Sequence, residues 1–265
     1  MSKQLLHTFV ICAYKESPYL DECIESLKNQ SVKSEIIIVT HTPCDYISDM
    51  AAKYDLTLFV NEGEGGITQD WNFGLSKVKT RFVTIAHQDD TYEPDYTKEL
   101  LSRMRKCKKP LIAFADYYEL RGEEKVDRTK MLNIKRFMLL PLRPWFAWKS
   151  KFIRRRILSF GDAICCPSVM YCLDNLEQPI FHNHFICCED WEAWEKLSRL
   201  EGEFVYVPKS LMSHRIHEES TTTKTLEQGG RIAENMEMYQ KFWPKWVAKL
   251  INHFYTDSEK SNDLS

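Results

Sequence analysis

The first half of the chain alternates short apolar runs with longer segments that have helical character. The apolar runs have the length and β-branched content of buried strands, and they cover residues 7–13, 35–40, 56–60, 82–86 and 110–116. The intervening helices are predicted over residues 18–27, 45–54, 67–77 and 94–107. Short connections in a repeated β-α order predict an α/β fold with a doubly wound, mostly parallel sheet.

The second half of the chain is less regular. Residues 161–167 read as a turn and a short buried strand, and residues 203–208 read as another strand. Between them, Trp191, Trp194 and Leu197 have the spacing of one helix face. A polar loop is predicted over 213–223, and the tail 256–265 is expected to be poorly ordered. We therefore predict three parts, which cover residues 1–116, 117–225 and 226–265.

Two adjacent carboxylates stand where the strand 82–86 ends, in the sequence His87-Gln88-Asp89-Asp90. Open α/β sheets bind ligands just outside the carboxyl ends of their strands. Oxygen-rich sites suit Mg²⁺ or Mn²⁺, which in turn hold substrate phosphates. The alternative is that Asp89 or Asp90 caps the helix that follows near Pro94. Because neither a GxGxxG nor a Walker A motif is present, a metal at Asp89 would take the place of a glycine-rich phosphate cradle.

Composition narrows the range of functions. Hydrophobic residues make up 43% of the 265 residues and charged residues 28%, which is typical of a globular protein. A net charge of −2 argues against a general nucleic-acid binder. No apolar run approaches the roughly 20 residues that span a membrane, and the N-terminus reads as a strand rather than a signal peptide. Nine cysteines without a CxxC pair predict free thiols in a reducing cytosol rather than a zinc site.

Segment 128–156 departs from this balance. It holds ten Lys and Arg residues and no Asp or Glu, interleaved with aromatic and aliphatic residues. Such a segment suggests contact with an anionic membrane surface or a phosphate-bearing partner. The alternative is a solvated basic face whose apolar side packs on the core. Nothing else in the chain supports a nucleic-acid groove.

Several motifs, taken in order, resemble family 2 glycosyltransferases of the GT-A fold. The resemblance is close over residues 7–110 and resumes later in the chain. It rests on these features: Ala13-Tyr14-Lys15-Glu16, the Leu20 to Gln30 pattern, Glu35 to Val39, the glycine-rich loop with Asn72 and Gly74, the acidic pair before Pro94, Glu189-Asp190-Trp191, and His214 to Thr222.

The resemblance implies that residues 1–116 bind a nucleotide-diphospho-sugar, with a UDP-sugar as the expected donor. Tyr14 and Glu16 would contact the base and ribose, and Thr40 and Asn72 would also contact the donor. Three residues would serve the diphosphate. Asp89 would bind a divalent metal, Mn²⁺ or Mg²⁺; Asp90 would support the metal or the sugar; and His217 would lie over the diphosphate and the metal.

Asp190 matches the general base that deprotonates the acceptor hydroxyl in this family. A single displacement needs a base on the acceptor side and charge neutralisation on the leaving diphosphate. The two carboxylate sites lie about 100 residues apart, which suits this division. The resemblance implies an inverting, hexosyl-type transferase that acts on a glycan or lipid-linked acceptor in cell-surface polysaccharide or glycolipid assembly. It would work in the cytoplasm, with peripheral contact at the inner membrane face through segment 128–156.

This chain departs from the family at two places. Thr40-His41-Thr42-Pro43 replaces the usual Asp-Asp-Gly-Ser, so the carboxylate that contacts the uracil ring is absent. His87 replaces the first acid of the DxD motif and becomes a candidate hydrogen-bond partner for a phosphate. Two rival functions stay open: a metal-dependent nucleotidyltransferase, and a non-catalytic relative that binds sugar nucleotides or glycans. Asp190 discriminates a sugar transferase from a nucleotidyltransferase, because only the sugar transferase needs it beside the anomeric carbon.

Overall fold

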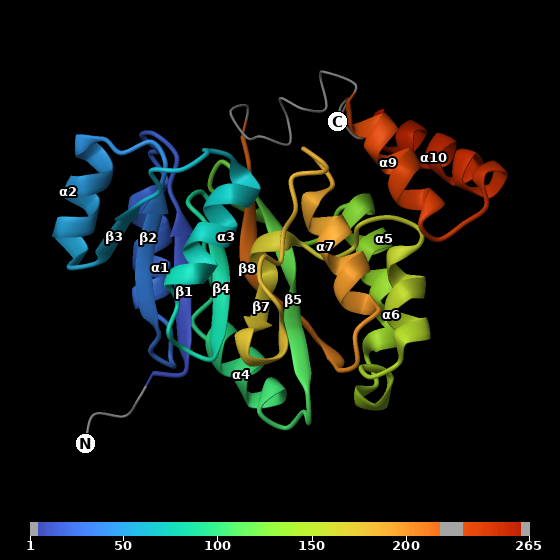
Figure 1. Cartoon of the computed structure of the whole chain (residues 1–265), viewed down its shortest axis with the longest axis horizontal. Coiled ribbons are helices and arrows are strands. Elements are labelled where there is room, and N and C mark those ends of the chain that lie inside the picture. The colour runs from blue at the N-terminus through green and yellow to red at the C-terminus, as the bar shows by residue number, and fades with distance from the viewer. Residues whose placement is uncertain (1–4, 218–229, 261–265) are drawn as a thin grey trace.

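An eight-stranded mixed sheet forms the centre of the computed structural model, which describes residues 5–217 and 230–260 (Figure 1). The sheet order is β3-β2-β1-β4-β7-β5-β6, and β8 pairs with β5. The strands are β1 (His7–Cys12), β2 (Glu35–Thr40), β3 (Thr57–Val60), β4 (Phe82–His87), β5 (Pro110–Arg121), β6 (Glu124–Val126), β7 (Val169–Cys172) and β8 (Glu203–Ile216). Strands β1 to β4 run parallel, and β7 is antiparallel to both β4 and β5. The predicted α/β fold with a mostly parallel sheet is confirmed.

Helices cover both faces of this sheet. One face carries α1 (Leu20–Lys28), α2 (Asp45–Tyr54) and α4 (Tyr96–Met104), and the other carries α3 (Ile67–Lys77) and α7 (Glu189–Ser198). In β1, Phe9 and Ile11 join the first layer and Val10 joins the second. Burial on both faces explains why these strands read as continuous apolar runs instead of alternating ones.

A glycine sets the distance between α3 and the sheet. A Cβ added at Gly74 would lie 2.5 Å from Cγ1 of Val10 and 3.3 Å from Cγ2 of Val39. Real Cβ atoms do not approach that closely, so α3 lies against β1 and β2 only because residue 74 has no side chain. This close packing brings the N-terminal turn of α3 next to the carboxyl ends of both strands.

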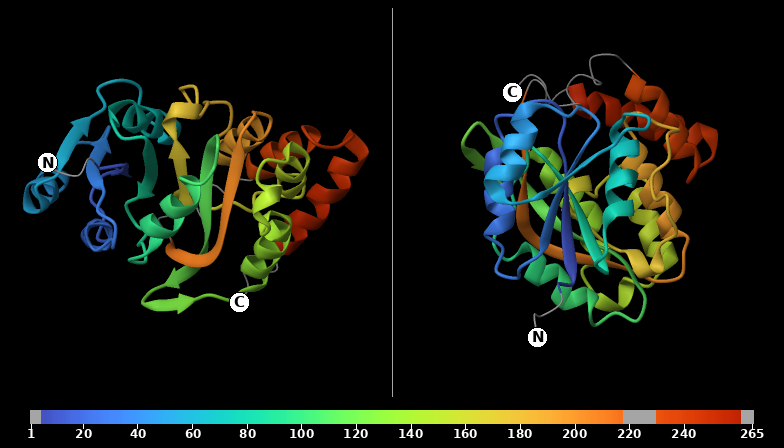
Figure 2. Two further views of the ribbon diagram at one scale, coloured as in Figure 1. Left: turned by 90° about the horizontal axis from the view of Figure 1, so that it is seen from below. Right: turned by 60° about the vertical axis from the view of Figure 1, so that its left-hand side comes forward.

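The second half adds a group of helices at one end of the sheet (Figures 1 and 2). The group contains α5 (Lys130–Leu139), α6 (Lys151–Leu158), α9 (Gly230–Gln240) and α10 (Lys245–Lys260), with short 3₁₀ turns between α5 and α6. Helix α6 packs against α7, where the indole Nε1 of Trp191 donates to the carbonyl of Leu158 at 3.0 Å. No helix in the described ranges is long and apolar enough to cross a membrane. All nine cysteines are free thiols.

Several predicted elements have different limits in the structure. The strand expected within 161–167 is wrong, because Pro167 lies in a 3₁₀ turn and the strand, β7, follows it. Strands predicted over 110–116 and 203–208 continue to Arg121 and Ile216. Pro208 does not end β8, because the ladder to β5 passes irregularly from Val207 to Ser210.

These longer strands change the predicted divisions. The boundary at 116 falls inside β5, and the division into three parts stays a prediction. Residues 213–216 of the predicted polar loop belong to β8, and 218–223 lie outside the described residues. Of the predicted disordered tail, 256–260 belong to α10 and 261–265 lie outside the described residues.

Candidate active site

The strand β4 ends at His87, and the chain then turns through Asp89 and Asp90. Asp90 N–H donates to the carbonyl of His87 at 3.3 Å, which closes this turn. Helix α4 begins only at Tyr96, with Asp95 at its N-cap. The helix-cap explanation of the acidic pair is therefore wrong. The two carboxylates face the carboxyl edge of the sheet, where α/β proteins bind ligands.

Three ligand atoms gather at this turn. One atom each from His87, Asp89 and Asp90 lies within 4.8 Å of the others. The end of β8 and the residue after it bring two more imidazoles: Nδ1 of His214 lies 3.6 Å from Oδ1 of Asp90, and Nε2 of His217 lies 2.9 Å from Oδ2 of Asp89. The structure thus brings together four predicted site residues, from the end of β4, the turn after it and the residue after β8, and places His214 beside them.

Several buried polar atoms in this cluster have no hydrogen-bond partner among the described residues. They are Nε2 of His87, Oδ2 of Asp90 and Nδ1 of His214. A buried polar atom without a hydrogen bond destabilises the folded protein, so three such atoms in one cluster indicate a binding site for a ligand. Carboxylate oxygens with imidazole nitrogens fit a divalent cation such as Mn²⁺. The residues present therefore fit the predicted metal.

The local charges keep Asp89 ionised. Burial by itself would raise the pKa of Asp89, but the hydrogen bond with His217 and the neighbouring imidazoles of His87 and His214 bring it below its ordinary value. For His214, burial favours the neutral ring, yet the adjacent Asp90 raises its pKa above the ordinary value. An ionised carboxylate surrounded by imidazoles is suited to hold a cation or to orient a phosphate.

Arg215 fixes the acidic turn against the first helix. Its backbone N–H donates to Oδ1 of Asp90 at 2.9 Å, and its Nε donates to the carbonyl of Asp89 at 2.8 Å. The guanidinium lies 4.3 Å from the centre of the Tyr19 ring and pairs with Glu22. Sequence reasoning missed Arg215, because the contact depends on β8 continuing past Pro208.

The ends of β1 and β2 lie beside this cluster. Gln88 accepts from Tyr14 N–H at 3.0 Å and donates to the Tyr14 carbonyl at 3.1 Å, which ties the end of β1 to the turn after β4. The Tyr14 ring is exposed, and its centre lies 5.6 Å from that of His41. Glu16 is exposed as well. Thr40 is buried, and its hydroxyl accepts from Thr42 N–H at 3.0 Å, so it shapes the turn.

His41 is held in one orientation. Its Nδ1 pairs with the buried carboxylate of Asp70, which also accepts from Asn61 Nδ2 at 2.9 Å. A Cβ added at Gly65 would lie 2.4 Å from Cδ2 of His41, so the glycine-rich loop packs directly on the ring. Sequence reasoning noted His41 only as a departure from the family and missed Asp70 altogether.

Asn72 has a positioning contact. Its side-chain amide donates to the carbonyl of Phe181 at 2.9 Å and accepts from Phe181 N–H at 3.2 Å. It therefore attaches α3 to the segment that leads into α7, on which Asp190 lies. The predicted direct role of Asn72 in donor binding stays a prediction.

Asp190 lies in the first turn of α7, after the N-cap residue Cys188. Its Oδ1 accepts from Trp191 N–H at 2.7 Å. Burial raises the pKa of Asp190, and the hydrogen bonds from Trp191 and Asp162 offset this only in part. Burial and the nearby charge of Asp190 raise the pKa of Asp162 well above its ordinary value. Both carboxyl pKa values are thus raised, that of Asp162 well above its ordinary value, and the two groups titrate as an interacting pair.

The two carboxylate sites share neighbours. Burial raises the pKa of the Cys165 thiol, and the charges of both Asp90 and Asp190 add to that rise. The ammonium group of Lys135, on α5, acts on Asp190 and on His214. Asp190 and the acidic turn, far apart in sequence, are thus brought close enough to act on one set of groups.

Comparison with known proteins agrees with this arrangement. Residues 8–176 match the model of the family described as Glycosyl transferase family 2. An uncharacterized glycosyltransferase of Rickettsia typhi is 23% identical over 259 residues, which cover 92% of this chain and 72% of that protein.

Two solved structures share the fold. Residues 1–349 of TarS from S. aureus, in complex with UDP-GlcNAc, superpose with a TM-score of 0.63 at 15% identity, covering 94% of this chain and 70% of that one. The mannosyltransferase PcManGT from Pyrobaculum calidifontis, in complex with GDP-Man and Mn²⁺, gives 0.64 at 12% identity, covering 95% and 71%. The family match extends over most of the sequence, and this chain therefore belongs to glycosyl transferase family 2.

Proposed function

We propose that this protein transfers a sugar from a nucleotide-diphospho-sugar to an acceptor hydroxyl and inverts the anomeric configuration. The observation that carries the proposal is the pair of separate carboxylate sites, the acidic turn after β4 and the Asp162–Asp190 pair at α7. A direct displacement needs a donor site and a base on opposite sides of the reacting carbon. The related structures with UDP-GlcNAc and with GDP-Man support a nucleotide-sugar donor, and a UDP-hexose is the expected one.

The acidic turn is proposed to hold the donor diphosphate. Asp89 and His217 would bind a divalent metal, Mn²⁺ or Mg²⁺, with Asp90 and His87 beside it. A cation held there would neutralise negative charge on the leaving diphosphate. His214 adds a further imidazole, whose raised pKa suits donation to a phosphate oxygen.

Asp190 is proposed to take the proton from the acceptor hydroxyl. Its raised pKa makes it a stronger base than an ordinary aspartate. A protonated Asp162 would donate a hydrogen bond to Asp190. The hydrogen bonds from Trp191 and Asp162 would orient the base before the acceptor arrives. A nucleotidyltransferase would instead need a Lys or Arg on the α-phosphate and has no acceptor hydroxyl beside an anomeric carbon to deprotonate.

The nucleobase is proposed to bind at Tyr14 and His41. In the neutral ring, donation of Nδ1–H to Asp70 leaves Nε2 as an acceptor, which suits an N–H group on the edge of a base such as uracil. The exposed Tyr14 ring offers a stacking surface beside it. His41 would thus replace the carboxylate that the family commonly uses.

Replacing His41 by alanine should weaken binding of UDP about tenfold, the effect of losing one hydrogen bond and a ring contact. Isothermal titration calorimetry with UDP measures this loss. Gly65→Ala should act in the same direction, because its new methyl group displaces the imidazole. Inorganic pyrophosphate serves as the control ligand, since it has no base. Equal weakening of UDP and pyrophosphate would contradict a base-reading role for His41.

The acceptor is proposed to be a glycan or a lipid-linked sugar. Helix α5 borders the acceptor side, because Lys135 acts on both Asp162 and Asp190. This helix lies at the start of segment 128–156. The predicted membrane contact is therefore next to the proposed acceptor site. The predicted cytoplasmic location at the inner membrane face stays a prediction.

A screen of nucleotide sugars by thermal unfolding, with Mn²⁺ present, tests the proposal. One UDP-sugar should raise the midpoint of unfolding more than UDP does, and that sugar should then turn over with a suitable acceptor. Stabilisation without any turnover, including hydrolysis, would favour the non-catalytic binding function. Release of pyrophosphate from a nucleoside triphosphate would favour a nucleotidyltransferase.

A further inference from the structure

Helix α6 and the segment before α10 form a surface of aromatic rings and arginines. We call it the α6 patch, and it consists of Phe152, Arg155, Arg156, Phe160, Phe242 and Trp243. The guanidinium of Arg156 lies 4.5 Å from the centre of one Trp243 ring and 5.5 Å from that of Phe152. Phe160 and Trp243 have ring centres 5.4 Å apart. Residues about 85 positions apart in sequence thus build one continuous surface.

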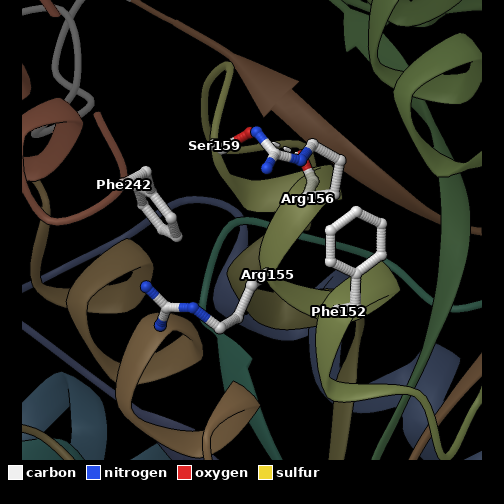
Figure 3. A pocket seen from close by; sticks show the side chains of 5 residues that line it. All are labelled: Phe152, Arg155, Arg156, Ser159 and Phe242. Carbon is white, nitrogen blue, oxygen red and sulfur yellow. Dashed lines mark hydrogen bonds between the residues drawn. The ribbon is translucent and has the colours of Figure 1, made fainter. Parts of the chain in front are cut away.

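A shallow pocket opens within the patch (Figure 3). It has about 100 Å³ of space and is lined by Phe152, Arg155, Arg156, Ser159 and Phe242. Arg155 is already committed, because its guanidinium pairs with Glu195 and donates to the carbonyl of Lys241 at 3.2 Å. Arg156 is exposed and has no carboxylate within ion-pair distance among the described residues. Its charge is held between two rings and points to an anionic ligand from outside the chain.

Some of the basic side chains of segment 128–156 are paired or buried in the structure, and others are exposed without an acidic partner in the described ranges. Arg136 pairs with Asp127 and Lys151 pairs with Glu201, while Arg154 is buried and donates to two backbone carbonyls. Other basic residues are exposed and lack a carboxylate partner in the described ranges: Arg128, Lys130, Arg143, Lys149 and Arg156. The exposed charge of this segment is therefore cationic throughout.

Large aromatic side chains stand in solvent along the same segment. Phe137, Trp145, Phe146 and Phe152 are between 62% and 74% exposed. Trp246, at the start of α10, is 73% exposed and follows Trp243 closely in sequence. Exposed aromatic residues on this scale mark an interaction surface. Aromatic rings combined with arginine and lysine match the polar–apolar boundary of an anionic bilayer.

We propose that the α6 patch docks on an anionic phospholipid membrane, with Phe152 inserted among the head groups and Arg156 bound to a lipid phosphate. Charge decides against a second copy of the chain, because two copies would bring like charges together. Helix α6 packs directly against α7, which carries Asp190, so a lipid-borne acceptor would reach the base from the bilayer side; this last step rests on the proposed function.

Flotation of the intact chain with lipid vesicles tests the docking. At low salt the protein should float with vesicles of phosphatidylcholine and phosphatidylglycerol in equal parts, and far less with phosphatidylcholine alone. Arg156→Gln should weaken this association about fivefold, and Phe152→Ser about tenfold. Added salt should release the protein, because screening weakens surface charge. Arg156→Lys keeps the charge and should retain most of the association.

Matched controls are available on the opposite side of the sheet. Arg105→Gln and Val32→Ser change an exposed arginine and an exposed apolar residue outside the patch, and they should leave flotation unchanged. Equal association with both vesicle types, or wild-type association in the Phe152→Ser and Arg156→Gln variants, would overturn the proposal. So would a dimer in light scattering that Phe152→Ser dissociates. UDP binding, measured on the same proteins, reports separately on the donor site and should not change.

Discussion

Replacing Asp190 by asparagine should slow sugar transfer by about 10²- to 10⁴-fold, the range that a general base contributes. Asparagine keeps the size of the side chain but cannot accept the proton of the acceptor hydroxyl. Donor binding should change little, because the donor diphosphate is proposed to lie at the acidic turn after β4. Single-turnover transfer and calorimetric titration with UDP, on the same preparation, measure the two quantities separately.

The pH profile gives an independent check on Asp190. Burial raises its pKa, so the rate should fall as the pH drops through that raised value and the base becomes protonated. The adjacent Glu189 is a matched control. Burial raises the pKa of Glu189 to about 8, so it is mostly protonated at neutral pH, and Glu189→Gln should leave transfer nearly unchanged. Loss of UDP binding in Asp190→Asn, or full activity in it, would contradict the base role.

The layers of the fold follow directly from the sequence. β1, β2 and β4 are apolar runs bounded by turn residues, and burial on both faces demands that composition. The location of Asp89 followed from the same logic, because ligands gather at the carboxyl ends of such strands. The limits of β5 and β8 did not follow. The pairing of β5 with β8 is irregular around Pro208, and a proline in the local sequence predicts the end of a strand there.

The partners of the site residues depend on that ladder. His217 reaches Asp89 across 128 positions only because β8 continues along β5 past the point where propensity predicts a loop. The pairing of His41 with Asp70 depends on α3 packing closely on the sheet through Gly74. No local periodicity encodes either contact. A sequence can therefore indicate which carboxylates face a ligand, while the groups that orient them come from tertiary packing.

Replacing Asp89 by asparagine should lower the affinity for Mn²⁺ with UDP about 100-fold or more. Loss of groups that only orient metal ligands costs about 10- to 100-fold, and a charged oxygen ligand contributes more. The carboxylate is ionised in the folded protein, with its pKa held below the ordinary value despite burial. Calorimetric titration with UDP, with Mn²⁺ and again with EDTA, measures the change without any need for turnover.

The response to EDTA separates loss of the metal from loss of the fold. In the wild-type protein EDTA should weaken UDP binding, whereas in Asp89→Asn it should have little further effect, because the cation is already absent. Asp95→Asn, an exposed carboxylate at the start of α4, should behave as wild type. If the Asp89→Asn variant still bound UDP in an EDTA-sensitive way, the cation would have to be bound by groups other than Asp89. Asp90, His87 and His214 would then be the residues to replace next, since each has a buried polar atom without a hydrogen bond to any described residue.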